Sequence, residues 1–213
     1  MNLLPEYTQY AKIFVGILAI VNPLGVIPVF LTLSADRPVQ ECKQIARVSA
    51  TAVACILIIA VWAGGPLLSF FGISIPAFRT GGGLLILLMA IAMLHAKQSH
   101  ASHSPEEAAA SQNKQDIAVV PLAIPLMAGP GGISLVIIDA HQAANWSDQL
   151  ILSICVVAVS LLVWLALRLA EPIGKHLGIT GLNIATRIMG LLLSAIGVQM
   201  IASGLTGLFP GLA

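Results

Sequence analysis

The chain has 213 residues, carries a net charge of +1, and is 58% hydrophobic but only 9% charged. Soluble domains are about one quarter charged, so this composition excludes a soluble protein. The small net charge also gives no reason to expect nucleic acid as a partner. The sequence therefore predicts an integral membrane protein in contact with lipids.

Six long stretches without charged residues follow one another along the chain. A bilayer core requires roughly 20 residues of helix, and backbone groups in hydrocarbon must be hydrogen-bonded within the segment. The stretches lack the polar alternation of membrane barrel strands. We therefore expect an all-α integral membrane protein with six transmembrane helices, at residues 13–35, 48–78, 80–96, 117–138, 149–167 and 188–213.

The basic residues are unevenly divided between the two ends of these helices. If the helices alternate in direction, the segments 32–47, 96–116 and 168–187 share one face, which holds most of the basic residues. Only Lys12 and Arg79 lie on the other face. The positive-inside rule then puts both termini outside, on the periplasmic side of a bacterial inner (plasma) membrane.

The two halves of the chain resemble each other. Arg79 and Gly82 in RTGGGLL match Arg187 and Gly190 in RIMGLLL, and each motif follows a similar tetrapeptide, FGIS or LGIT. Each half holds three predicted helices, an odd number, so the second half enters the membrane from the opposite face. The sequence predicts one membrane domain over residues 1–213, made of two inverted three-helix repeats, 1–95 and 117–213, and a flexible cytoplasmic linker, 96–116.

A helix-breaking motif recurs near the start of each half. NPLGVIP begins at Asn22 and GPGGISL begins at Gly129. Pro23 and Pro130 lie near the middle of their stretches, where proline removes a backbone donor and clashes with the preceding turn. We therefore expect discontinuous first and fourth helices, although two structural proline kinks would give the same pattern. Inverted repeats with matched breaks indicate a transporter whose binding site lies near the midplane.

The two breaks would bring free backbone groups into one pocket. The N-termini of half-helices favour an anion, and the carbonyl groups at half-helix C-termini favour a cation. A small zwitterionic amino acid satisfies both requirements, and the Asn22 amide can fix its orientation. The predicted substrate-binding residues are Asn22, Leu24, Gly25, Met127, Ala128, Gly129, Gly131, Gly132 and Ser134, with Pro23 and Pro130 as the helix breaks.

Other polar residues give weaker predictions. Arg79 and Arg187 lie at equivalent helix starts, and both anchoring to lipid headgroups and a gating role remain open for them. The histidines of the linker lack a thiol or a fixed scaffold, so we predict no metal site and no cofactor.

Four motifs resemble the MarC family, occur in its order, and extend the resemblance over essentially the whole chain. The resemblance implies a six-span transporter of neutral amino acids. It also transfers the helix-break motifs onto Asn22, Pro23, Gly25, Gly129, Pro130 and Gly131. The motifs are NPLGVIPVF (22–30), FGISIPAFRTGGGLL (71–85), PLAIPLMAGPGGIS (121–134) and TRIMGLLL (186–193).

These observations favour a secondary transporter of small neutral amino acids, such as glycine or alanine, that works by alternating access. No acidic residue is expected in mid-membrane, so a cationic substrate would lack a partner. Coupling to Na⁺ or H⁺, the direction of transport and the oligomeric state stay open. A channel or a non-transporting membrane protein is the alternative. An intramembrane enzyme fits least, because the histidines lie at helix ends and no acid pair is present.

Overall fold

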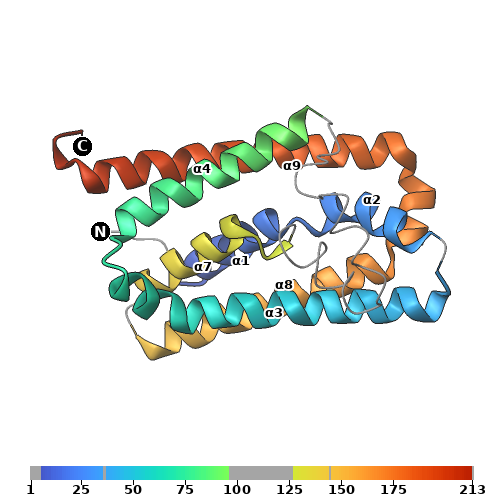
Figure 1. The fold of residues 1–213 in the computed structure, drawn as a ribbon, viewed down its shortest axis with the longest axis horizontal. Coiled ribbons are helices and arrows are strands. Elements are labelled where there is room, and N and C mark those ends of the chain that lie inside the picture. The colour runs from blue at the N-terminus through green and yellow to red at the C-terminus, as the bar shows by residue number, and fades with distance from the viewer. Residues whose placement is uncertain (1–5, 36, 96–126, 144, 213) are drawn as a thin grey trace.

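The computed structural model describes residues 6–35, 37–95, 127–143 and 145–212, and in these ranges it is a bundle of helices without strands (Figure 1). The predicted all-α class is therefore confirmed. The predicted linker, 96–116, lies outside the described residues. The helices are α1 (Glu6–Val21), α2 (Pro23–Ser34), α3 (Val39–Phe70), α4 (Ile75–Leu94), α7 (Pro130–Gln142), α8 (Trp146–Arg168) and α9 (Ala170–Leu208), followed by the 3₁₀ helix η2 (Pro210–Leu212).

Five segments of the described chain are long and apolar enough to cross a membrane, which agrees with a multi-pass protein. The sixth predicted span, 117–138, is described only from residue 127, and α7 by itself has 13 residues, fewer than a full crossing requires. The number six thus stays a prediction. The five segments are Thr8–Ser34, Val39–Phe70, Ile75–Leu94, Trp146–Arg168 and Thr180–Leu208.

Several helix boundaries differ from those predicted. α3 begins at Val39, ahead of the charge-free stretch, and ends at Phe70. The segment 168–187, expected to be a loop, is largely helical, because α9 begins at Ala170. The helix is interrupted at Gly178, where φ is +61° and ψ is 179°, ahead of the apolar segment Thr180–Leu208. Charge-free stretches mark the residues that tolerate hydrocarbon, whereas helices extend beyond them, where water and headgroups accept charged side chains.

The helices alternate in direction along the bundle. α1 begins and α9 ends at one end, where the turn between α3 and α4 also lies, and the turns that follow α2 and α8 lie at the opposite end (Figure 1). At the first end, Tyr10 donates a hydrogen bond to Asp148 (2.9 Å), and the rings of Trp62 and Trp146 stack edge to face at 5.9 Å. Amphipathic aromatic residues gathered in this way are typical of a membrane interface.

Apolar side chains occupy both the interior and the outside of the bundle. The main core joins α1, α2, α3, α7 and α8 through aliphatic side chains such as Val53, Leu57 and Val136, all fully buried. Outward-facing leucines and isoleucines, including Ile154 and Leu191, stay exposed. A surface of this kind is stable in lipid and would aggregate in water.

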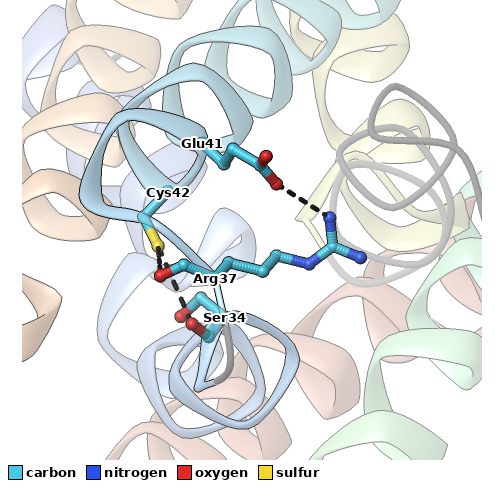
Figure 2. Close-up of polar contacts among 4 residues, drawn as sticks. All are labelled: Ser34, Arg37, Glu41 and Cys42. Carbon is cyan, nitrogen blue, oxygen red and sulfur yellow. Dashed lines mark hydrogen bonds and ion pairs between the residues drawn. The ribbon is translucent and has the colours of Figure 1, made fainter.

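A short turn joins α2 to α3 at the end opposite the termini. The thiol of Cys42 approaches the backbone carbonyl oxygens of Ser34 and Arg37, each at 3.7 Å, and Arg37 pairs with Glu41 at 3.5 Å (Figure 2). All three cysteines, Cys42, Cys55 and Cys155, are free thiols.

Glycines allow α4 and α9 to lie in close contact along their length. A Cβ atom at Gly83 would lie 2.8 Å from the carbonyl oxygen of Gly197, and one at Gly197 would lie 2.9 Å from that of Gly83. Gly190 and Gly204, one heptad to either side, face the backbone of α4 in the same manner. Small residues at such seams let membrane helices approach closely enough for van der Waals packing.

This seam predicts different effects for substitutions at two nearby glycines of α4. Gly83→Val should destabilise the protein by about 1–3 kcal/mol, because the new side chain meets the backbone of α9. Gly81→Val adds the same atoms where no atom lies within 4 Å and should change stability little. The free energy of unfolding in mixed detergent micelles measures both variants. Equal destabilisation by the two would show that the seam is not tightly packed.

Candidate functional site

The first membrane helix is interrupted at Asn22, between α1 and α2. Asn22 has left-handed backbone angles, φ 46° and ψ 64°, and among the described residues no other non-glycine residue has a positive φ. Asparagine tolerates this conformation because its short amide can bond locally. Its Oδ1 accepts a hydrogen bond from the backbone N–H of Gly25 at 3.1 Å, and Pro23 starts the new helix. Asn22 thus acts as the N-cap of α2.

The Asn22 side chain is buried, with 7% of its surface exposed. Its Nδ2 points toward the sulfur of Met93 on α4, at 3.8 Å. An amide held by one backbone donor and one thioether keeps further hydrogen-bonding capacity, because an asparagine amide offers two donors and two lone pairs. The sequence contained no motif that would have identified Met93 as its neighbour.

The second predicted break adjoins the start of α7. Gly129 is extended and precedes Pro130, the first residue of α7, with no side chain capping the helix. The N–H groups of the first turn, at Gly131 and Gly132, have no acceptor within the helix. Residues 96–126 lie outside the described part of the chain, so the discontinuity expected in the fourth helix stays a prediction.

The start of α7 lies against the end of α1. A methyl group at Gly131 would lie 2.6 Å from Cγ1 of Ile86 on α4 and 3.6 Å from Cγ2 of Ile20 on α1. At Gly132 it would lie 3.5 Å from the Met127 carbonyl oxygen and 3.7 Å from Leu57 on α3. Residues from α1, α3, α4 and α7 therefore converge on the first turn of α7, and the glycines let these residues approach its backbone closely.

A groove with a volume of about 650 Å³ runs between α4 and α7, and its lining includes Pro130, the first residue of α7, but neither Gly131 nor Gly132. Pro130 and Ser134 line it from α7, and Gly82 lines it from α4. A Cβ atom at Gly82 would lie 2.7 Å from the Ser134 hydroxyl oxygen, so the two helices meet at this point. Most of the remaining lining is apolar.

The predicted substrate-binding residues differ in exposure. Leu24 is 41% exposed, so its side chain points away from the interior and only its backbone can contribute. Pro130 is also exposed, and Gly25 is half-buried. The remaining members are buried: Asn22, Met127, Ala128, Gly129, Gly131, Gly132 and Ser134.

The two arginines predicted to anchor or to gate have different surroundings. Arg79, on α4, is half-buried and interacts electrostatically with the carboxyl group of Asp139 on α7. The two groups do not form a direct ion pair in this structure. Arg187, on α9, is exposed. The relation of Asp139 to Arg79 depends on the packing of α4 against α7, which the sequence did not show.

The chain is similar to known membrane proteins. The family described as MarC family integral membrane protein matches residues 7–209. The UPF0056 membrane protein YhcE of Escherichia coli K12 is 37% identical over 97% of this chain and 96% of its own length. The UPF0056 membrane protein YvbG of Bacillus subtilis 168 is 37% identical over 96% of this chain and 97% of its own length. No solved structure matches the chain.

The capping role of Asn22 predicts an order of stability among substitutions. Asn22→Ala should cost about 2–3 kcal/mol, because it removes the helix cap and places a Cβ without local hydrogen bonds in the left-handed region. Asn22→Gly should cost less than about 1 kcal/mol, since glycine adopts positive φ freely. Thermal unfolding of the two variants in detergent checks the order. An alanine variant as stable as the glycine variant would contradict it.

Proposed function

The chain belongs to the MarC family of integral membrane proteins, and we propose that it is a secondary transporter of small neutral amino acids. Its substrate would bind near the midplane, between the Asn22 break and the start of α7, and be exposed to either face by alternating access. We further propose that it resides in the cell inner membrane with both termini outside, because its basic residues gather at the opposite end.

The observation that carries the proposal is the buried interruption at Asn22. Membrane helices are continuous unless the freed backbone groups are satisfied by protein or line a cavity. Here the interruption combines a left-handed residue, an N-cap and a proline at the next position. Transporters use such broken helices to present backbone groups to a substrate.

The chemistry of the site supports a zwitterion. In this conformation Asn22 already occupies the N–H of Gly25, so the uncapped first turn of α7, at Gly131 and Gly132, is the better site for a carboxylate. Carbonyl groups at the ends of the preceding segments, around Val21 and Met127, suit an ammonium group. Ile20, Leu57 and Ile86 would limit the substrate side chain to a small apolar group.

The packing of the helices supports two inverted repeats. Helices at equivalent positions of the two halves pair with each other, α3 with α8 and α4 with α9. α2 packs on α8 and α9, and α7, its counterpart after the second break, packs on α3 and α4. The matched tetrapeptides FGIS and LGIT each place a glycine at positive φ, Gly72 at 66° and Gly178 at 61°. A pseudo-twofold arrangement accounts for all three observations.

A transport assay on variants of the proposed substrate site tests the proposal. Purified protein in liposomes loaded with alanine should take up labelled alanine by counterflow. Asn22→Ala and Gly132→Ala should each lower the initial rate at least about tenfold, since each removes or blocks one binding contact worth about 1.4 kcal/mol. Gly132→Ala is informative because its methyl group would make only ordinary contacts with the protein, so folding should be spared.

The matched control is Gly65→Ala, a half-buried glycine of α3 with no atom within 4 Å of the added methyl group. It should transport at the wild-type rate. Repeating the assay with imposed Na⁺ and H⁺ gradients identifies the coupling ion, or shows uncoupled exchange. Counterflow no faster than in empty liposomes would reject the transporter. Equal rates in the Gly132→Ala and wild-type proteins would reject this substrate site.

Arg79 and Asp139 offer a test of gating. They belong to opposite predicted repeats, so an attraction between them would close the site toward the end where the termini lie. Arg79→Gln and Asp139→Asn should each slow counterflow, and the double variant should be no slower than the slower single variant. The initial rates of counterflow of the two single variants and the double variant measure whether the residues act together. Effects that multiply would mean that the two residues act independently.

A further inference from the structure

A second groove lies on the outside of the bundle, at the end opposite the termini. It runs between the start of α3 and the end of α8 and has a volume of about 540 Å³. Its rim and walls include Lys43, Arg47, Ala54, Leu161, Trp164 and Arg168. None of these residues belongs to the proposed transport site, which leaves the groove without a role.

The rim of the groove is positively charged. Lys43 and Arg47 lie one helical turn apart on α3, and Arg168 is the last residue of α8. The Arg168 guanidinium lies 5.1 Å from the centre of the Trp164 ring, a cation–π contact that holds it beside the groove. Of the described residues that line the groove, three are basic and none is acidic.

The nearby acidic residues have their own partners. The Glu41 carboxylate points to Arg37, at 3.5 Å (Figure 2). Glu171 pairs with Lys175 at 2.7 Å, and this hydrogen bond lowers the pKa of the Glu171 carboxyl group. Within the described ranges, no carboxylate lies at ion-pair distance from Lys43, Arg47 or Arg168. Within these ranges no carboxylate neutralises the rim, so the rim can pair with a negatively charged ligand.

Below the rim the groove offers hydrocarbon contact. The hydroxyl groups of Thr51 and Ser160 donate to carbonyl oxygens of their own helices, at 2.8 and 2.9 Å, and so need no further partner. Ala54 keeps the groove open. Val157 and Leu161 are 43% and 59% exposed on the outer apolar surface. A ligand that fits has an anionic head at the rim and a hydrocarbon chain along the helices.

We propose that this groove binds an anionic phospholipid. The phosphate would be held by Arg47 and Arg168, with Lys43 at the edge, and one acyl chain would lie along Ala54, Val157 and Leu161. Basic pockets between transmembrane helices at the positively charged side recognise such headgroups, and each basic residue near the surface adds to the attraction. The interfacial Trp164 lies at the matching depth.

Lipid binding to the full-length protein tests the proposal. The protein is purified in a neutral detergent and titrated with phosphatidylglycerol, phosphatidylcholine of the same acyl chains, or glycerol phosphate, which has the head but no chains. Binding is followed by native mass spectrometry. Phosphatidylglycerol should bind at least about tenfold more tightly than either of the others.

Three variants separate the groove from general surface charge. Arg47→Gln with Arg168→Gln should weaken phosphatidylglycerol binding at least about tenfold, and Ala54→Phe should do so without changing any charge. Arg37→Gln with Lys175→Gln removes the same number of charges outside the groove and should bind as the wild type does. Thermal unfolding of each variant without lipid verifies that it is folded.

Three outcomes would overturn the proposal. Equal losses in the two double variants would mean that net charge alone attracts the lipid. Equal affinity for phosphatidylcholine or for glycerol phosphate would mean that the rim or the chain is not recognised. Native mass spectrometry also reports how many protein copies each detergent particle holds. If the groove variants changed that number but bound as much lipid as the wild type, the groove would be a contact between copies of the chain.

Discussion

In hydrocarbon, the backbone N–H and C=O groups of a polypeptide must form hydrogen bonds within the protein. This constraint explains why the helix interruption at Asn22 is capped by a side chain and followed by proline. The break would leave the first N–H groups of α2 without acceptors, and the Asn22 side chain supplies one of them from within the same turn. Proline at the next position removes another donor. The interruption is thus stabilised locally, and the first turn of α7 beside it keeps its donors uncapped. The start of α2 is capped and the start of α7 is not, so the proposed site would hold the carboxylate of its ligand at α7.

The surrounding helices differ in how tightly they can be packed. α4 and α9 meet through backbone atoms at Gly83 and Gly197, a contact that leaves no room for any other side chain. α7 meets α4 at Gly82 and Ile86, and Gly82 also lines the groove between the two helices. α4 thus borders both the close-packed seam with α9 and the groove toward α7.

Much of this arrangement could be predicted from the sequence, for identifiable physical reasons. Charge-free stretches indicated the helices, because charges are costly in lipid, and Asn22-Pro23 indicated the break, because proline cannot continue a helix. Helix ends were predicted poorly, since α3 and α9 extend into the interface where charges are tolerated. The contacts of Asn22 with Met93, of Gly131 with Ile86 and of Arg79 with Asp139 could not be predicted, because they depend on how helices distant in sequence pack together.

An amino acid that uses the proposed site must reach the start of α7 from both sides of the membrane. Ser134 is 3% exposed and borders the groove, and the native thiols at Cys42, Cys55 and Cys155 can be replaced. With Ser134→Cys as the remaining thiol, labelling by a membrane-impermeant maleimide can be measured from each face of a sealed vesicle. We expect labelling from both faces and protection by alanine. A thiol that reacts from neither face, or reacts equally with and without alanine, would contradict the account.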